Sequence, residues 1–255
     1  MKKIIVFLII LIGGYAIYNE AALLSFPAKN KANFSESKLE HTSDKCDVYS
    51  IPISNPKRPN GTVYAIILKK HQMDFKVAEA NESSNDFYIN SNFFEKGPIG
   101  EVKIDGEIKN RKKRGGGFFT SNGKSPKIFF GSRPSSVRYS SQTHLIGIKN
   151  GVINNRICKH KWAKLKYYRI LIGKDKNNNV VVIHSDNGGF LSIKDVCEIG
   201  IKYGVINGLL FDGGSSVEVG LKDGFYFHSF RAVSAIGKKM AGIHKPYAYI
   251  VGNFN

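Results

Sequence analysis

Short apolar runs, rich in β-branched and aromatic residues and broken by Gly and Asn, occupy most of the chain after residue 45. Such runs are typical of β-strands, and the breaks between them are typical of turns. Because strands are stable only when they pair and bury one face, we expect an α+β fold: a single domain with a large mixed or antiparallel sheet and few helices. The expected strands are 48–53, 63–68, 87–89, 102–104, 128–130, 145–148, 169–172, 180–184, 206–211, 226–228, 232–236 and 247–251.

One segment has the pattern of a helix. Ser192, with Asp195 three residues later, predicts a capping box at its start, and Gly204 predicts its end. Cys197 falls on the apolar face of this helix, so we expect its thiol to be buried. Residues 159–166 are compatible with either a second, short helix or a loop.

The N-terminus has the features of an export signal. Met1-Lys2-Lys3 supplies positive charge, and a short apolar stretch follows, so residues 1–25 are predicted to be a signal peptide or a membrane anchor. The polar residues 26–45 are predicted to be a tether, and residues 46–255 to be the folded domain. We expect an exported protein, whether periplasmic, membrane-anchored or secreted, with membrane association through the N-terminal segment as one option.

The chain carries a formal net charge of +18, which favours contact with polyanions. Phosphate-bearing cell-wall polymers, lipopolysaccharide and anionic lipids are candidate partners. A nucleic-acid partner is not expected, because no nucleic-acid-binding motif accompanies the charge. The basic run 109–114 is interpreted either as a solvated hairpin tip or as an arm that follows a polyanionic substrate.

The three cysteines, Cys46, Cys158 and Cys197, permit at most one disulfide. Their spacing does not predict a zinc site, and no residues have the spacing of metal ligands. We therefore predict neither a metal site nor a cofactor. A divalent cation between Asp212 and a phosphate group stays an open alternative that no motif supports.

The segment from Gly208 to Ser216 places a carboxylate at the end of an apolar strand. Asp212 ends the run and is followed by Gly213, Gly214, Ser215 and Ser216. A carboxylate in this position is held rigidly, and the glycines allow a ligand close to the main chain. The turn amides and the hydroxyls can also form an anion-binding nest, although Asp-Gly-Gly is equally an ordinary turn.

A second block, from Tyr88 to Phe94, places side-chain amides and aromatic rings at another strand end. Asn90 and Asn92 are the amides, and Phe93 is the first of two phenylalanines. The residues that follow, 97–106, predict a turn and then a β-hairpin.

Together these two blocks resemble the phosphodiester glycosidase family, which typically has an Asn-small-Gly-Phe-Phe block and a Leu-Asp-Gly-Gly-Gly-Ser-Ser block. Similar blocks continue in the family's order along residues 60–253, which identifies 46–255 as a phosphodiester glycosidase-like domain. The further blocks are 115–119, 142–146 with 149–151, 168–173 and 230–236. Asn92, Ser215 and His144-Leu145 depart from the family pattern; these changes leave the expected fold intact and bear on the width of the pocket and the choice of substrate.

The resemblance implies hydrolysis of the bond between a sugar anomeric carbon and a phosphodiester. The predicted site consists of a carboxylate, two guanidinium groups that clamp the phosphate, and groups that bind the substrate. The catalytic candidates are Asp212, Arg169 and Arg231, and the substrate-binding candidates are Asn90, Asn92, Phe93, Gln142, Gly213, Gly214, Ser215 and Ser216.

Each of these candidates also has a structural interpretation. The arginines are equally compatible with surface ion pairs, the amides with turns, and Phe93 with the core. Glu218 is a second candidate carboxylate whose face on its strand is undecided. His184 is expected to be structural, and Asp186 to belong to a turn.

The expected function is an exported hydrolase that cleaves a sugar-1-phosphodiester in an envelope or extracellular glycan or glycolipid. The alternative is a non-catalytic envelope protein that binds anionic polysaccharide.

Overall fold

The computed structural model describes residues 31–54, 61–79, 84–94, 98–233 and 247–255. Three large sheets make up the fold, and every pairing within them is antiparallel. This confirms the expected α+β class with few helices. The predicted export signal, residues 1–25, lies outside the described residues. Within the described ranges, no helix is long and apolar enough to cross a membrane.

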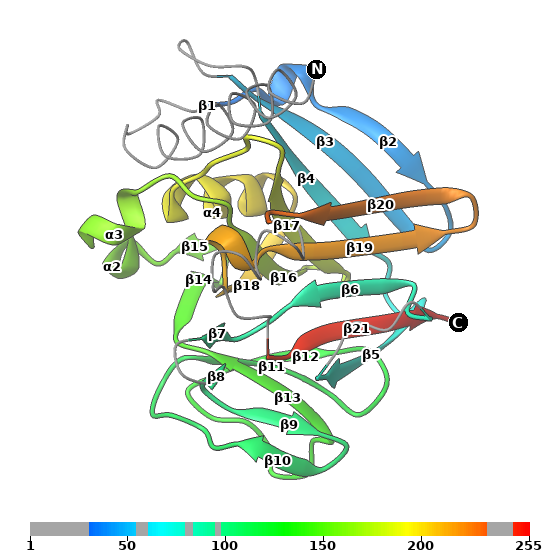
Figure 1. Cartoon of the computed structure of the whole chain (residues 1–255), viewed down its shortest axis with the longest axis vertical. Helices are drawn as coiled ribbons and strands as arrows, with labels where there is room; N and C mark the ends of the chain where they lie inside the picture. The colour runs from blue at the N-terminus through cyan, green and yellow to red at the C-terminus, as the bar shows by residue number, and fades with distance from the viewer. Residues whose placement is uncertain (1–30, 55–60, 80–83, 95–97, 234–246) are drawn as a thin grey trace, which may run out of the picture.

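The largest sheet has nine strands and forms the centre of the molecule (Figure 1). Its order is β1-β3-β4-β17-β16-β18-β14-β15, and β2 pairs with β3 beside this path. The strands are β1 (Lys31–Ala32), β2 (Lys38–Thr42), β3 (Cys46–Ser54), β4 (Gly61–Leu68), β14 (Leu145–Lys149), β15 (Val152–Ile153), β16 (Ile170–Asp175), β17 (Val180–Asp186) and β18 (Val205–Phe211).

A five-stranded sheet packs against one face of the nine-stranded sheet. Its order is β20-β19-β6-β21-β5, with β5 (Met73–Ala78), β6 (Phe87–Asn90), β19 (Glu218–Asp223), β20 (Tyr226–Arg231) and β21 (Tyr249–Phe254). One apolar core joins the two sheets, because Ile66, Val182 and Phe211 from the first belong to the same buried cluster as Phe87 and Val219 from the second.

The third sheet, at the bottom of Figure 1, has the order β10-β9-β13-β11-β12. Asp105 and Gly106, both with positive φ, form the two-residue turn of the expected hairpin between β9 and β10. The strands are β9 (Val102–Ile104), β10 (Glu107–Asn110), β11 (Gly117–Ser121), β12 (Lys127–Phe130) and β13 (Tyr139–Thr143). A separate two-stranded ladder pairs β7 (Phe93–Phe94) with β8 (Pro98–Ile99).

Helix α4 (Ile193–Lys202) covers the other face of the nine-stranded sheet. Ser192 and Asp195 form the expected capping box, and Cys197 is fully buried, as predicted. Residues 159–166 do contain a short helix, α3 (Lys161–Lys164), preceded by α2 (Asn155–Cys158). Two 3-10 helices complete the described structure, η1 (Phe34–Glu36) and η2 (Gly214–Ser216).

The prediction of a polar tether at residues 26–45 is wrong for its described part. Residues 31–42 contain β1, η1 and β2, and both strands pair with β3. The folded domain therefore includes residue 31. Strand β2 is not predicted from the sequence because most of its side chains are exposed and the strand has no alternating apolar pattern. It forms through main-chain pairing with β3.

Most of the expected strands are present, and their ends agree with the structure within three residues. The prediction for 232–236 lies partly outside the described residues, and residues 232–233 form a bend instead of a strand. Among the strands not predicted, β13 is fully buried although its sequence is Tyr-Ser-Ser-Gln-Thr. The side chains of Ser141, Gln142 and Thr143 form hydrogen bonds that make this burial tolerable, whereas the buried hydroxyl of Ser140 has no partner among the described residues.

Candidate active site

Strands β17 and β18 end, and β16 begins, on the same side of the nine-stranded sheet, and the predicted carboxylate lies there. The edge named below is this row of strand ends. Phe211, the last residue of β18, pairs with Ile170, the first residue of β16, and Ile170 pairs in turn with His184 of β17. Continuing this register by one or two residues places Asp212, Arg169 and Asp186 along one edge of the sheet. This edge is the candidate active site.

The turn after Asp212 is built against the main chain of Tyr168, two residues before β16. A Cβ added to Gly213 would lie 2.5 Å from the carbonyl oxygen of Tyr168, so Gly213 is required by the approach of its own chain. Gly214 has φ +62° and donates its amide to the same carbonyl at 2.8 Å. A Cβ added to Gly214 would meet no atom of the described residues within 4 Å, so among these residues nothing keeps a ligand from the main chain there, unlike at Gly213.

Ser215 and Ser216 lie in η2, half-buried, directly after this turn. Ser216 donates its amide to Gly213 at 3.3 Å, so part of the predicted nest is used within the turn. Because Gly214 adopts the left-handed conformation and Ser215 a 3-10 conformation, serine in place of the family's third glycine causes no backbone strain.

Asn90 joins the carboxylate turn to the second sheet. Its Nδ2 donates to the carbonyl oxygen of Asp212 at 2.9 Å, and its Oδ1 accepts from the amide of Glu218 at 2.8 Å. Asn90 is fully buried, and both ends of its side-chain amide bind main chain. The two sequence blocks that predict the site therefore meet through this residue, which positions Asp212.

Asn92 joins the same segment to the third sheet. Its φ of +43° is the left-handed conformation that the family's glycine would adopt, and asparagine tolerates it better than most residues. Its Nδ2 donates to the carbonyl oxygen of Gln142 at 2.9 Å, and its Oδ1 accepts from the hydroxyl of Ser141 at 2.6 Å. Phe93, the next residue, is half-buried and pairs with Ile99.

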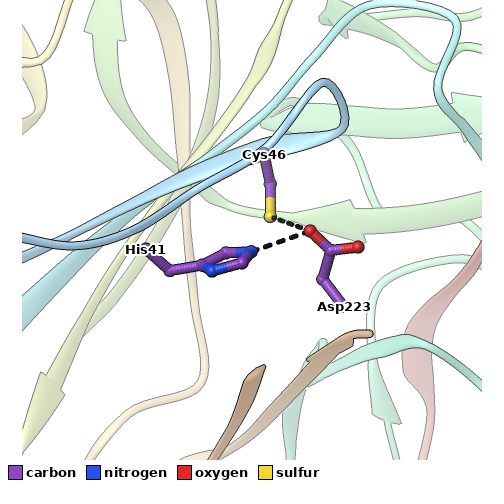
Figure 2. Close-up of side chains that lie close together, drawn as sticks. All are labelled: His41, Cys46 and Asp223. Atoms are coloured by element: carbon purple, nitrogen blue, oxygen red, sulfur yellow. Dashed lines mark hydrogen bonds and ion pairs between the residues drawn. The ribbon is translucent and has the colours of Figure 1, made fainter. Parts of the chain in front are cut away.

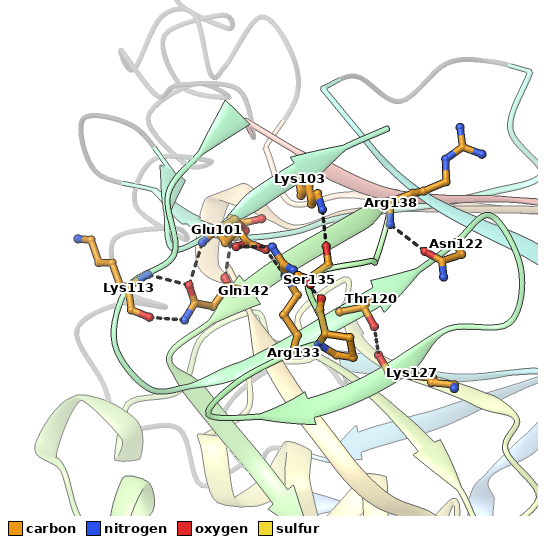
Figure 3. Close-up of polar contacts among 12 residues, drawn as sticks. Glu101, Lys103, Lys113, Thr120, Asn122, Lys127, Arg133, Ser135, Arg138 and Gln142 are labelled. Atoms are coloured by element: carbon orange, nitrogen blue, oxygen red, sulfur yellow. Dashed lines mark hydrogen bonds and ion pairs between the residues drawn. The ribbon is translucent and has the colours of Figure 1, made fainter. Parts of the chain in front are cut away.

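Gln142 uses its whole side-chain amide to hold two loops (Figure 3). Oε1 accepts from the amides of Glu101 and Lys113, each at 2.9 Å, and Nε2 donates to the carbonyl oxygens of Lys113 and Gly115, each at 2.7 Å. Gln142 is fully buried, so it acts as a positioning residue. It fixes the main chain of the basic run 109–114, whose residues 111–114 are exposed.

A buried ion pair supports the same network. The guanidinium of Arg133 donates to both carboxylate oxygens of Glu101, Nε to Oε1 at 2.5 Å and Nη2 to Oε2 at 2.7 Å (Figure 3). The two side chains are 9% and 2% exposed. This bidentate geometry holds Glu101, whose main chain binds both Gln142 and Asn92.

Arg169 is held by carbonyl groups near the site edge. Nε donates to the carbonyl oxygen of Leu191 at 3.2 Å and Nη2 to that of Leu165 at 3.0 Å, while the guanidinium lies over the ring of Tyr167. Burial lowers the pKa of Arg169 to about 10, so the group keeps its charge at neutral pH. The structure gives Arg169 a fixed positive charge and a role in holding two loops.

Arg231 pairs with Glu218, its cross-strand partner. The carboxylate of Glu218 is 5% exposed, lies 3.4 Å from the guanidinium of Arg231, and accepts from the hydroxyl of Tyr249 at 2.9 Å. Burial and the Glu218 carboxylate raise the pKa of Tyr249. The guanidinium is the more exposed partner, so it presents positive charge at the surface above a buried carboxylate.

Beneath the edge, the structure forms a histidine pair that the sequence does not predict. The Nε2 atoms of His184 and His228 lie 3.0 Å apart. His184 Nδ1 is 3.1 Å from the carbonyl oxygen of Ser185, which only accepts; Nδ1 therefore donates, and Nε2 accepts from His228. Burial lowers the pKa values to about 3 for His184 and about 4 for His228.

Asp186 ends β17 above this pair, and the expected turn follows it. One carboxylate oxygen lies 3.8 Å from Nε2 of His228, and the other accepts from the amide of Asn187 at 2.6 Å. Burial raises the pKa of Asp186 to about 6. A carboxyl group that titrates near neutral pH at a sheet edge is a candidate for proton transfer.

A family model matches most of the chain. The model for the phosphodiester glycosidase family matches residues 78–236, which is more than half of the chain and includes both predicted blocks. None of the curated proteins matches the chain in sequence.

Solved structures share the fold at low sequence identity. The catalytic domain of zebrafish N-acetylglucosamine-1-phosphodiester alpha-N-acetylglucosaminidase, auto-inhibited by its pro-peptide, superposes with a TM-score of 0.57 and 12% identity, covering 86% of this chain and 87% of that one. A hypothetical protein from Synechocystis gives 0.55 and 11%, covering 89% and 68%. A Burkholderia pseudomallei protein described as exported gives 0.50 and 8%, covering 76% and 74%.

The Gln142 network predicts a large stability cost for a near-isosteric change. In Gln142→Glu an oxygen replaces Nε2 and faces the carbonyl oxygens of Lys113 and Gly115, so the free energy of unfolding should fall by about 3 kcal/mol. Urea denaturation measures this. The half-buried Gln72→Glu is the matched control and should change stability by less than about 0.5 kcal/mol. Equal effects in the two variants would contradict the role given to Gln142.

The histidine pair predicts a loss of stability in acid. Both imidazoles have folded pKa values below the unfolded value of 6.5, so their contribution is complete above that pH and is lost as pH falls toward about 4. Asp186, with its raised pKa, makes a smaller contribution of opposite sign to the slope of the unfolding free energy against pH. His228→Gln should flatten the dependence of unfolding free energy on pH over this window, whereas the exposed control His160→Gln should not. An unchanged slope in His228→Gln would refute the assignment.

Proposed function

The chain belongs to the phosphodiester glycosidase family, and we propose that it is a hydrolase that cleaves the bond between a sugar anomeric carbon and a phosphodiester. The observation that carries the proposal is the position of Asp212. It ends a central strand, its main chain is held by the buried Asn90, and an open glycine and two hydroxyls follow it.

The reaction needs little acid assistance, because its leaving group is a phosphate. Water adds to the anomeric carbon, the bond from that carbon to the phosphate oxygen breaks, and the phosphate leaves as an anion. Phosphate has a second pKa of about 6, so it departs more easily than a sugar alcohol. In this proposal Asp212 is the base that takes the proton of water, or the negative charge that stabilises the developing oxocarbenium ion.

Asp186 is our candidate for the second carboxyl group. Continuing the sheet register places it two strands from Asp212, about 10 Å away between backbones. Its raised pKa, about 6, suits a group that exchanges a proton with the substrate near neutral pH. In the case where Asp212 is the anion that stabilises the oxocarbenium ion, Asp186 is the base that takes the proton of the attacking water.

The phosphate is proposed to lie near Arg231, whose side chain is 41% exposed. Arg169 contributes fixed positive charge, because its hydrogen bonds to Leu165 and Leu191 hold it in place. Ser215 and Ser216 are proposed to donate to phosphate or sugar oxygens. In this proposal Asn90, Asn92 and Gln142 support the site through the main chain instead of touching the substrate.

The proposed substrate is a phosphate-bearing glycan or glycolipid outside the cytoplasm. The charge of +18 and the exposed residues 111–114 favour a polyanion. Export is supported by the N-terminal sequence and by likeness to a protein described as exported. The name of the zebrafish enzyme makes an N-acetylglucosamine-1-phosphodiester the first compound to test.

A specific observation also favours the alternative, a non-catalytic protein that binds anionic polysaccharide. Both arginines predicted to clamp phosphate have partners within the protein, Arg169 with carbonyl groups and Arg231 with Glu218. In a binding protein these contacts would persist, and the exposed basic run would supply the affinity.

Asp212→Asn distinguishes the two functions. For the hydrolase, the substitution should lower kcat by about 10²- to 10⁴-fold with little change in substrate affinity, because the charge is lost and the shape is kept. Sugar released from a panel of sugar-1-phosphodiesters and nucleotide sugars, with and without EDTA, measures this. Asp44→Asn, in the exposed turn after β2, is the matched control and should keep full activity.

The same assay tests Asp186, since Asp186→Asn should remove the limb of the pH-rate profile near pH 6. No release from any substrate by the unaltered protein, together with tight binding to anionic glycans, would establish the binding function instead. Release that EDTA abolishes would show that catalysis needs a divalent cation.

The basic run predicts a salt-dependent preference for polymeric substrates. Replacing Arg111, Lys112 and Arg114 by serine should raise KM for a polyanionic glycan and weaken its dependence on salt, while leaving a small sugar-1-phosphodiester unaffected. Serine at Lys124, Lys127 and Lys176, exposed near the opposite end of the sheets, removes the same charge as a control. Equal effects from both triple variants would mean that only net charge matters.

A further inference from the structure

A second polar cluster lies at the far end of β19 from Glu218. Two side chains of the β2–β3 hairpin, His41 from β2 and Cys46 from the start of β3, meet Asp223 from the end of β19 there (Figure 2). The Nε2 atom of His41 is 2.8 Å from Oδ2 of Asp223, and Sγ of Cys46 is 3.5 Å from the same oxygen. All three ligand atoms lie within 4.8 Å of one another.

The fold holds each of these side chains in place. Cys46 is fully buried, and Asp223 is 9% exposed. The ring of His41 stacks on that of Tyr226, with centroids 4.4 Å apart and 11° between the planes. Ser43 accepts the amide of Cys46 at 3.1 Å and shapes the turn between β2 and β3, so that His41 and Cys46 face the same side of this hairpin.

The donors match the preferences of one kind of metal ion. Zn²⁺ binds thiolate at about 2.3 Å and imidazole or carboxylate at about 2.0–2.2 Å, usually as a tetrahedron. Ligand atoms at those distances are about 3.3–3.6 Å apart. The separation of 3.5 Å found here lies within this range, and the separation of 2.8 Å must widen by about half an ångström. A hard cation such as Mg²⁺ is a poor match, because it does not favour a thiolate.

We propose that His41, Cys46 and Asp223 form a zinc site, in which one ion joins the β2–β3 hairpin to the β19–β20 hairpin. Three protein ligands leave the fourth position of the tetrahedron to water. The ion is proposed to link the two hairpins and not to take part in the hydrolase reaction, because the cluster lies at the opposite end of the six-residue strand β19 from Glu218, about 17 Å away. Burial of Cys46 and Asp223 beside the half-buried His41 is costly, and a shared cation compensates for it better than a weak thiol donor.

The competing explanation is that hydrogen bonds hold the cluster together without a metal ion. In that case the thiol of Cys46 and the ring of His41 donate hydrogen bonds to Asp223, and added metal changes nothing. The proposal does not depend on the proposed hydrolase activity, so its test uses no enzymatic readout.

The experiment uses the whole protein, purified without added metal, stripped with a chelator and then titrated with Zn²⁺ or Co²⁺. We expect elemental analysis to find one zinc ion per chain, and the cobalt form to show thiolate-to-metal charge-transfer absorption. Cys46→Ser should lose this absorption, whereas Cys158→Ser, which changes a half-buried cysteine on α2, should keep it.

Thermal unfolding gives a second readout. Zn²⁺ should raise Tm of the stripped protein, and this shift should disappear in His41→Gln and Asp223→Asn. If Cys46→Ser does not fold, the cobalt spectrum of the unaltered protein still reports thiolate ligation. If the unaltered protein shows neither stoichiometric zinc nor a charge-transfer band, the proposal is overturned. The cluster is then held by hydrogen bonds alone.

Discussion

Buried side-chain amides connect the three sheets, and the candidate active site depends on them. Asn90 binds the end of β18 and the start of β19, while Asn92 and Gln142 extend the connection to β9, β13 and the loop before β11. An amide suits this position because it offers donors and acceptors without a charge that would be costly to bury. Removing one partner would leave several main-chain groups unsatisfied, so the network holds as a unit.

The site edge combines groups with different electrostatic surroundings. Asp186 lies above two neutral imidazoles, and burial favours its protonated form. Glu218 is compensated by Arg231 and Tyr249. Asp212 follows a strand fixed on both sides by β14 and β16. Differences of this kind are what allow neighbouring carboxylates to take different roles in one reaction.

The sequence supports predictions where a signal is local. Apolar runs locate β3, β4, β17 and β18, and the pair Ser192 and Asp195 locates α4. The blocks around Asn90 and Asp212 predict two residues that the structure joins by a hydrogen bond. The prediction for residues 31–45 is wrong for the same reason. A polar strand at an exposed position has no local apolar pattern by which it could be predicted.

What the sequence does not predict depends on pairing between distant segments. His184 and His228 meet only because two sheets pack face to face, and His41 and Cys46 meet Asp223 only because two hairpins cross. Nor does the sequence distinguish Gln142 as a ligand for substrate from Gln142 as a support for loops, because a turn and a site need the same residue types. That choice follows from burial and from the four main-chain contacts.

The contacts that Asn90 and Gln142 make through their side-chain amides all end on main-chain atoms. Since every residue except proline offers the same amide and carbonyl, the partner positions can exchange their side chains freely while the frame survives. Side chains around the site can therefore change during evolution, and the charge and selectivity of the site with them, while the main-chain framework stays the same. A protein organised in this way can diverge to 12% identity from a structure of the same architecture.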